Sequence, residues 1–288
     1  MDMSTEFAPL RKVLLFRPTP DIENADPQSA CHLSPINHAK ITDEIDNLAE
    51  WYQKHGIAVI CIDPSNLGTS QEYLYNMMYC RDLFVRTPDA VLLARMYHSV
   101  REDETRYAER TLRETGMKIK KLQQGPLEGA DCLWLRPDRL LIGTNKRTSM
   151  VAFEEVRREM RKHGITTMHV NINPYLCTQH LLGIMQIVDS KKVFVRYEHA
   201  PEELLDILLD AGYHVIKVND DEEITERQAF NIVCIAPSRI IMASGCPKTK
   251  AMFENNGIEV VGELCIDELR KGAGGLACAT GIMERDRA

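Results

Sequence analysis

The chain has 288 residues, of which 44% are hydrophobic and 27% are charged. This composition is typical of a globular protein and excludes a fibrous or disordered one. The formal net charge is -7, so the chain is not built to bind nucleic acid by neutralising phosphates. No stretch approaches the roughly 20 apolar residues of a membrane helix, and the N-terminus lacks a signal-peptide pattern. We therefore expect a cytoplasmic protein that binds neither nucleic acid nor a membrane.

The nine cysteines are an odd number and form no CxxC pair. Several lie in apolar runs, as in Val59-Ile60-Cys61 and Ile232-Val233-Cys234, so we expect buried, reduced thiols. Cys278 differs, because it follows a glycine-rich segment. The sequence also has no HExxH motif and no closely spaced histidine pair, so we expect neither a metal nor a cofactor.

In chain order, residues 12–17 are predicted to form the first strand, and a helix is predicted at 37–55. The helix ends at Gly56, and an apolar strand follows at 57–62. The connection 19–35 has three prolines and no clear period, so we expect it to be irregular. Because a connection this long in a compact domain is usually functional or disordered, we expect it to act as a lid over a bound ligand.

Farther along the chain, one pattern recurs four times. Each repeat begins with two apolar runs joined by a turn, and the turns lie near Pro88, Pro137, Asp189 and Pro237. A helix follows each hairpin, and the predicted helices cover 103–115, 148–163, 200–211 and 246–256. Each helix ends at a glycine that an apolar strand follows. The repeating unit is therefore strand–strand–helix–strand, with a period of about 50 residues.

A single unit of this kind cannot bury its apolar face alone, so the copies must pack against one another. The N-terminal segment lacks one strand of a fifth unit, which residues 280–284 can supply. We therefore predict an α/β fold: a five-bladed α/β-propeller with pseudo-fivefold symmetry, in which residues 1–288 form one domain. The alternative is a doubly wound sheet, which gives no reason for a hairpin at a fixed period.

Polar clusters occur at similar positions in these repeats. They are Arg81-Asp82, Glu128-Gly129-Ala130-Asp131, Gln179-His180 and Gly274-Gly275-Leu276-Ala277-Cys278. Each cluster alone has an ordinary structural explanation: a surface ion pair, a turn, a packed histidine or a packed cysteine. The run Lys271–Gly275 could also be a phosphate loop, but it lacks the GxxxxGK[ST] order. In a ring, however, side chains at corresponding positions converge on the axis, so we expect these clusters to meet.

In their order and spacing, these clusters, together with Lys146-Arg147-Thr148, resemble the guanidino-group-modifying enzymes of the pentein superfamily. This group includes arginine deiminases, agmatine deiminases, dimethylarginine dimethylaminohydrolases and amidinotransferases. The resemblance extends from Phe7 to the Cys278 segment. It implies a five-bladed propeller and a small guanidino substrate, with no metal or cofactor. The oligomeric state is left open, with a homodimer as one alternative.

The resemblance also implies a role for each candidate residue. Cys278 matches the nucleophile that forms a covalent amidino-thioether intermediate. His180 matches the general acid and base, and Glu128 matches the carboxylate that orients it. For substrate binding, Asp82 matches the carboxylate that holds the guanidinium. Of the remaining candidates, Arg101 and Arg147 match arginines that bind a substrate carboxylate, whereas Asp131 could bind the substrate or only shape the turn.

The chain departs from the deiminase pattern in three ways. Leu182 stands where a second guanidinium-binding aspartate is usual, and Ala277 stands where a histidine often precedes the cysteine. The length also leaves no room for the helical insertion of many arginine deiminases. These features favour the dimethylarginine type. We predict a hydrolase that gives a ureido product such as citrulline; the alternatives are an amidinotransferase and a non-catalytic binding protein of the same fold.

Overall fold

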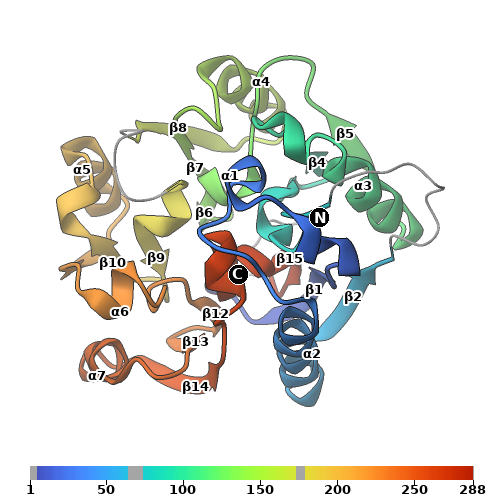
Figure 1. The fold of residues 1–288 in the computed structure, drawn as a ribbon. Coiled ribbons are helices and arrows are strands. Elements are labelled where there is room, and N and C mark those ends of the chain that lie inside the picture. Colours follow the sequence, from blue (N-terminus) through green and yellow to red (C-terminus); the bar gives the residue numbers. More distant parts are fainter. Residues whose placement is uncertain (1–4, 64–73, 173–178, 288) are drawn as a thin grey trace.

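The computed structural model describes residues 5–63, 74–172 and 179–287. These residues form five three-stranded sheets, which are arranged as a ring with the long helices on its outside (Figure 1). Each sheet and its helix form one blade of the predicted propeller. The predicted fold is therefore confirmed, and the doubly wound sheet is excluded.

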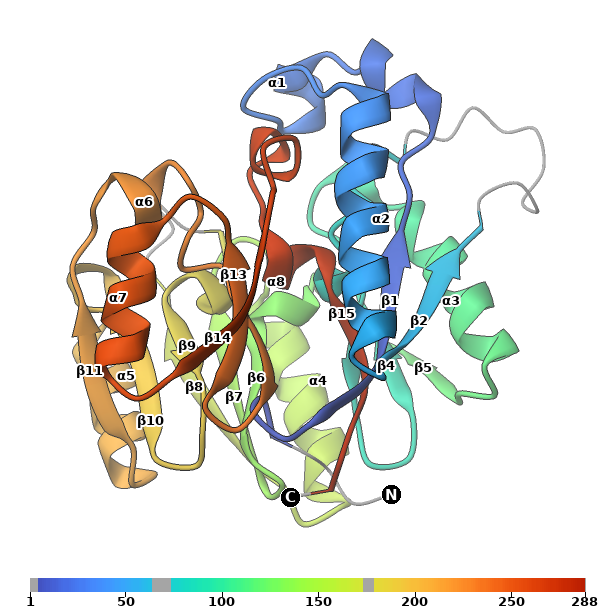
Figure 2. The same cartoon turned by 90° about the horizontal axis from the view of Figure 1, so that it is seen from below.

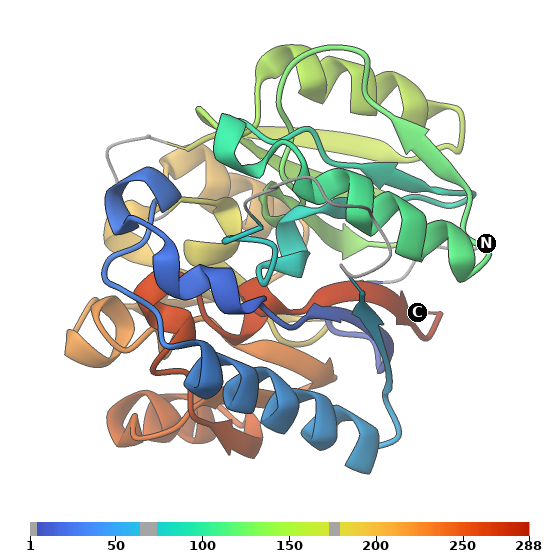
Figure 3. The ribbon, with the colours of Figure 1, turned by 45° about the vertical axis from the view of Figure 1, so that its right-hand side comes forward.

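The blade that closes the ring combines both ends of the chain. It consists of β15 (Gly281–Arg285), β1 (Leu10–Phe16), α2 (His38–Lys54) and β2 (Ala58–Ile62). Strand β1 pairs antiparallel with β15 and parallel with β2, and the N-terminal and C-terminal strands run side by side in Figure 3. The C-terminal segment thus supplies the missing strand, as the repeat predicted.

The other four blades follow one another in the chain, each with an antiparallel hairpin and a parallel third strand. The second blade contains β3 (Phe84–Arg86), β4 (Val91–Leu93), α3 (Glu104–Glu114) and β5 (Ile119–Lys121). The third contains β6 (Cys132–Arg136), β7 (Arg139–Thr144), α4 (Met150–Arg161) and β8 (Thr166–Asn171). The fourth contains β9 (Met185–Ile187), β10 (Lys192–Arg196), α5 (Glu202–Asp210) and β11 (His214–Val218). The fifth contains β12 (Val233–Ala236), β13 (Arg239–Ala243), α7 (Pro247–Asn255) and β14 (Glu259–Leu264).

A glycine follows the helix in every blade and reverses the chain into the third strand. All five have a φ between +72° and +83°, namely Gly56, Gly116, Gly164, Gly212 and Gly257. This left-handed conformation strains any residue with a Cβ, which explains why glycine recurs there.

The core is formed by the inner faces of the helices and by the strands. In α2, the buried residues Ile41, Ile45, Leu48 and Tyr52 recur every three or four positions, so they form one face of the helix. The Tyr52 hydroxyl lies 2.8 Å from the Thr280 hydroxyl. Helix α2 is thereby anchored beside the segment that enters β15.

Three sequence-based expectations need comment. The connection 19–35 is not irregular throughout: it contains a 3-10 helix at Pro20–Asn24 and α1 (Pro27–Ala30). A proline lies at the start of each of these helices, where its missing amide hydrogen costs nothing. The Asp26 carboxylate caps α1 by accepting a hydrogen bond from the Ser29 amide at 2.8 Å.

No helix in the described parts of the chain is long and apolar enough to cross a membrane.

The expectation of buried cysteines was wrong for Cys61 and Cys265, which are exposed. Cys61 lies on β2, which pairs only with β1 and is therefore an outer strand, so an apolar run did not imply burial on both faces. The other described cysteines are buried or partly buried, and all eight described cysteines are free thiols. Cys177 lies outside the described residues.

Candidate active site

The predicted polar clusters meet near the ring axis, because each lies at or shortly before the first strand of a blade. Asp82 ends a 3-10 helix that leads into β3, and Asp131 ends another that leads into β6. His180 precedes the 3-10 helix that leads into β9. Cys278 lies in α8 (Leu276–Ala279), directly before β15. Figure 2 shows α8 inside the ring, below the N-terminal segment that contains α1.

A cavity of about 420 Å³ opens at this point. Five of the seven predicted site residues line it: Asp82, Arg101, Arg147, His180 and Cys278. The remaining two, Glu128 and Asp131, are fully buried and lie behind the lining residues. The cavity lining also includes Cys31 and Leu33, which places the end of the connection 19–35 at its edge.

The side chains of His180 and Glu128 form a buried pair. His180 Nε2 lies 2.7 Å from Glu128 Oε2, and His180 Nδ1 lies 3.8 Å from Asp82 Oδ1. Burial alone would lower the pKa of His180, but the carboxylates of Asp82, Asp131 and Glu128 outweigh burial and raise it. The pair therefore favours an imidazole that holds a proton and can donate it.

The pKa of Glu128 is shifted in the opposite direction. Burial would raise it, but the hydrogen bond from His180 and the charges of His180, Arg101 and Arg147 lower it. Glu128 Oε1 also accepts a hydrogen bond from the Tyr97 amide at 3.2 Å. A permanently ionised carboxylate in this position fixes the orientation of the imidazole ring.

Asp82 has one satisfied and one unsatisfied oxygen. Its Oδ2 accepts a hydrogen bond from Arg101 Nη1 at 2.7 Å. Among the described residues, its buried Oδ1 has no hydrogen-bond donor. Asp82 is only 3% exposed, and a buried acceptor without a donor is costly. This oxygen is therefore available to a donor that enters the cavity.

The Arg101 guanidinium is already engaged by the protein. Besides Asp82, it donates to Glu104 Oε2 at 3.0 Å and to the Asn76 carbonyl at 3.3 Å. Burial opposes its charge, but Glu104, Asp82 and Glu128 raise its pKa. For Glu104 itself, burial dominates and raises the pKa to about 7. Arg101 thus holds buried acids together, and its donors are less available to a substrate carboxylate than the sequence suggested.

Arg147 is the more accessible of the two arginines. It donates to Glu128 Oε2 from Nη1 at 3.2 Å, and its side chain is 13% exposed, against 5% for Arg101. Arg147 therefore remains the better candidate for binding a substrate carboxylate.

Asp131 does not line the cavity. Its carboxylate accepts hydrogen bonds from the Thr148 hydroxyl at 2.7 Å, the Leu181 amide at 2.9 Å and the Asn145 amide group at 3.3 Å. Burial is the main cause that raises its pKa, to about 6. Of the two roles left open for Asp131, this geometry favours the structural one: it connects the loops that carry Arg147 and His180.

Cys278 lines the cavity and contacts Asn231. The Asn231 amide group donates to Cys278 Sγ at 3.0 Å and accepts from the Cys278 backbone amide at 3.1 Å. Burial raises the pKa of the Cys278 thiol, and the negative charge of Asp82 raises it further. Without a cation in the cavity, the thiol therefore favours its protonated form.

The glycines before Cys278 allow the backbone to approach the side chains of Tyr79 and Asn231 closely. A Cβ at Gly274 would lie 2.3 Å from the Tyr79 ring, and one at Gly275 would lie 2.9 Å from the Asn231 Cβ. The Tyr79 hydroxyl in turn donates to the Leu269 carbonyl at 2.7 Å. The segment thus needs glycine to bring Cys278 against Asn231.

Three of these residues could also hold a metal ion. Ligand atoms of Asp82, Glu128 and His180 lie within 4.8 Å of one another. In this structure, however, His180 Nε2 is hydrogen-bonded to Glu128, and Arg101 neutralises Asp82. Of the possible metal-ligand atoms just described, Asp82 Oδ1 is the one left without a hydrogen-bond partner among the described residues. A cationic organic ligand can bind this single carboxylate oxygen as well as a metal ion can.

The sequence analysis missed residues that complete the site. Asn231 lies two positions before β12, the same place that Asp82 takes before β3, so the phase of the repeat could have identified it. Glu104 follows Arg101 by three positions and bonds it. Arg196 also lines the cavity, where it is paired with Asp220; no local pattern marked it.

Known proteins resemble this chain in sequence and in fold. A family model described as arginine deiminase matches residues 69–203. The arginine deiminase of Borreliella burgdorferi (strain ZS7) is 23% identical over 88% of this chain and 69% of its own length. The N(G),N(G)-dimethylarginine dimethylaminohydrolase of Streptomyces coelicolor is 22% identical over 94% of this chain and 96% of its own. A solved structure of a mutant dimethylarginine dimethylaminohydrolase from Pseudomonas aeruginosa, complexed with citrulline, has a TM-score of 0.76 and 19% identity, and the match covers 96% of this chain and 100% of that one.

Proposed function

Because the chain belongs to the guanidino-group-modifying enzymes of the pentein superfamily, we propose that it hydrolyses a C–N bond of arginine or an arginine derivative through Cys278. One observation carries this proposal. A buried carboxylate oxygen of Asp82 has no hydrogen-bond donor among the described residues, and Asp82 lines the same cavity as Cys278. A guanidinium supplies both the missing N–H donor and an electrophilic carbon.

The site takes residues from every blade. Asp82 belongs to the second blade, Glu128 to the third, His180 to the fourth, Asn231 to the fifth and Cys278 to the blade that closes the ring. No single blade contains the whole set. We therefore propose that the chain works as a single catalytic domain.

In the first step, Asp82 binds the guanidinium by charge-assisted hydrogen bonds and fixes its plane. The substrate charge offsets the Asp82 charge that raises the Cys278 pKa, so the thiolate forms as the substrate binds. Sγ then attacks the central carbon. As the S–C bond forms and a C–N bond breaks, His180 gives its proton to the departing amine.

In the second step, water replaces the departed amine. His180, now neutral, takes a proton from the water, and the hydroxide attacks the amidino carbon. A C–O bond forms, the C–S bond breaks with its electron pair going to the Cys278 thiolate, and the proton left on the product oxygen is released to water. The product is a ureido compound, such as citrulline from arginine. Glu128 keeps the imidazole oriented in both steps through its 2.7 Å contact.

The leaving group and the acceptor distinguish three alternatives. Release of ammonia indicates a deiminase, release of an alkylamine indicates a dimethylarginine-type hydrolase, and transfer to an added amine indicates an amidinotransferase. Incubation with arginine and with dimethylarginine, each with and without glycine or ornithine, separates them. The proposal requires a ureido product whose yield does not depend on the added amine. No turnover of any guanidino compound would instead favour a non-catalytic binding protein.

A further inference from the structure

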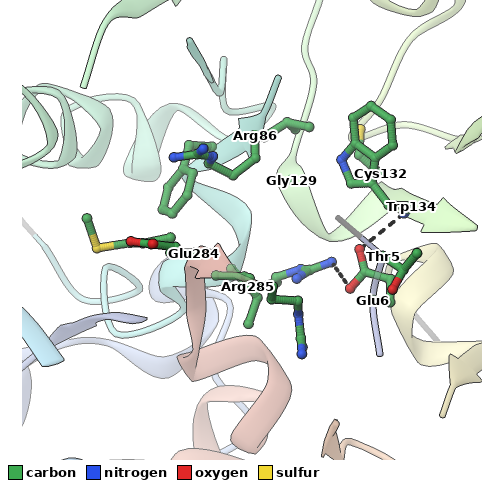
Figure 4. A pocket seen from close by; sticks show the side chains of 13 residues that line it. Thr5, Glu6, Arg86, Gly129, Cys132, Trp134, Glu284 and Arg285 are labelled. Atoms are coloured by element: carbon green, nitrogen blue, oxygen red, sulfur yellow. Dashed lines mark hydrogen bonds and ion pairs between the residues drawn. The ribbon is translucent and has the colours of Figure 1, made fainter. Parts of the chain in front are cut away.

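A second pocket, of about 80 Å³, lies apart from the candidate active site. It shares no lining residue with the cavity around Cys278. We call it the rear pocket and define it by five of its polar lining residues, most of which Figure 4 labels: Glu6, Arg81, Arg86, Trp134 and Arg285.

The rear pocket extends along strands that begin near the catalytic groups, from Arg81 and Cys132 near their start to Arg86 and Arg285 at their far ends. Arg86 is the last residue of β3, Trp134 is in the middle of β6 and Arg285 is the last residue of β15. These strands start next to Asp82, Asp131 and Cys278 respectively. In Figure 2, β15 runs from α8 toward the end of the molecule opposite α1. The rear pocket therefore extends away from the cavity around Cys278, toward the end of the molecule opposite α1.

The charges of the rear pocket do not balance within it. Arg81, Arg86 and Arg285 supply three cations. Glu6 is occupied, because its Oε2 accepts from Arg81 at 2.9 Å and its Oε1 accepts from the Trp134 amide at 3.1 Å. The second acid in the lining, Glu284, forms an ion pair with Lys12 at 3.4 Å, outside the pocket. Glu284 also acts on the charge of Arg86. Three arginines and two acids thus line the pocket, which leaves one net positive charge.

Two buried donors in the rear pocket have no acceptor among the described residues: the indole Nε1 of Trp134 and the Nε of Arg285. Trp134 is only 5% exposed, and in Figure 4 its indole nitrogen lies on the side of the ring toward Arg86. Buried donors are normally satisfied. Burial also lowers the pKa of Arg285 and of Arg86, so a nearby anion would stabilise both charges.

We propose that the rear pocket binds a small oxyanion, either a phosphate or a carboxylate. Its oxygens would accept from Trp134 Nε1 and from the guanidinium of Arg285, with Arg86 adding charge. One water needs about 10–15 Å³ of such space, so a volume of 80 Å³ holds a group of several heavy atoms. The anion would connect β6 to β15 on the side away from the cavity.

The test is calorimetric titration of the intact protein with inorganic phosphate and, separately, with acetate, at constant ionic strength. We expect saturable binding of phosphate, of acetate or of both. Tighter binding of phosphate would indicate a site for a tetrahedral anion, and tighter binding of acetate would indicate a site for a planar carboxylate. The substitution Arg285→Gln should weaken binding of the preferred anion about tenfold or more, because it removes a charged hydrogen-bond donor. Trp134→Phe, which keeps a ring but loses one neutral donor, should weaken it about fivefold. If Arg285→Gln does not fold, Trp134→Phe decides.

Two controls make the result specific. Arg239→Gln changes an exposed arginine paired with Glu259 and should leave the affinity unchanged. Arg147→Ala alters the cavity around Cys278 and should also leave it unchanged. Absence of saturable binding, equal affinity in Trp134→Phe and the native chain, or loss of binding in Arg147→Ala would each overturn the proposal. Binding requires no turnover, so this result is independent of the proposed reaction.

Discussion

At the scale of single residues, the reactivity of Cys278 depends on the charge across the cavity. Burial and Asp82 both raise the pKa of its thiol. We therefore expect alkylation of Cys278 by iodoacetamide to accelerate with pH, with a midpoint above the value of about 8.5 for a free thiol. Asp82→Asn removes a negative charge and should shift this midpoint to lower pH. A midpoint that stays the same or rises would show that Asp82 does not act on the thiol.

The protonation of His180 gives a second pH-dependent prediction. Its pKa is raised, so the proton that it donates is present below that pKa and is lost as the pH rises through it. Glu128→Gln removes one carboxylate that raises this pKa. The alkaline limb of the kcat profile should therefore move to lower pH, and kcat should fall. An alkaline limb at the same pH would assign it to another group.

Arg147 and Arg101 should respond differently to truncation. Arg147→Ala should raise KM for substrates with an α-carboxylate and have little effect on agmatine, which has none. Arg101→Ala leaves the buried acids Asp82 and Glu104 without their cation, so it should lower the free energy of unfolding by about 3–5 kcal/mol. Steady-state kinetics with both substrates and urea denaturation check the two outcomes. Equal loss of activity toward agmatine in Arg147→Ala would assign it a structural role.

At the scale of secondary-structure elements, the connection 19–35 is the part of the structure best placed to control access. Cys31 and Leu33 line the cavity, and the Leu33 amide donates to the Lys271 carbonyl at 2.6 Å. Leu33 is nevertheless 73% exposed. The Asn76 amide group also donates to the Ala30 carbonyl at 2.7 Å. A segment that is anchored by such hydrogen bonds but carries an exposed apolar side chain suits a lid that packs down when a ligand arrives.

We therefore predict that a bound substrate analogue protects residues 19–35 from limited proteolysis. The measurement is the rate of cleavage within this segment, determined by mass spectrometry with the analogue absent and at saturation. Cleavage elsewhere in the chain provides the internal reference. If saturation leaves the cleavage rate within 19–35 unchanged, the segment is not a lid.

The elements themselves were predictable from local sequence. Five glycines with positive φ mark the helix ends, and the turn residues mark the hairpins. The helices within 19–35 were not predicted, because prolines that begin helices were interpreted as breaks. The exposure of Cys61 was also missed, because it depends on which strand lies at the edge of a sheet.

At the scale of the whole molecule, the repeat predicted the ring, and the ring predicted which residues converge. Asp82, His180 and Cys278 are far apart in the chain but line one cavity. The sequence could not show how the donors are shared once they meet. Arg101 bonds Asp82 and Glu104 within the second blade, and Asn231 of the fifth blade bonds Cys278 of the closing blade. The period of the repeat does not encode such side-chain contacts.

The most direct test of the central claim is mass spectrometry of the Cys278 peptide after a reaction with a guanidino substrate is quenched with acid. We predict a covalent adduct on Cys278 whose mass equals that of the substrate minus the leaving amine. Cys278→Ser should give no adduct and less than a tenth of the native rate. Turnover without an adduct on Cys278, combined with near-native activity in Cys278→Ser, would contradict the account.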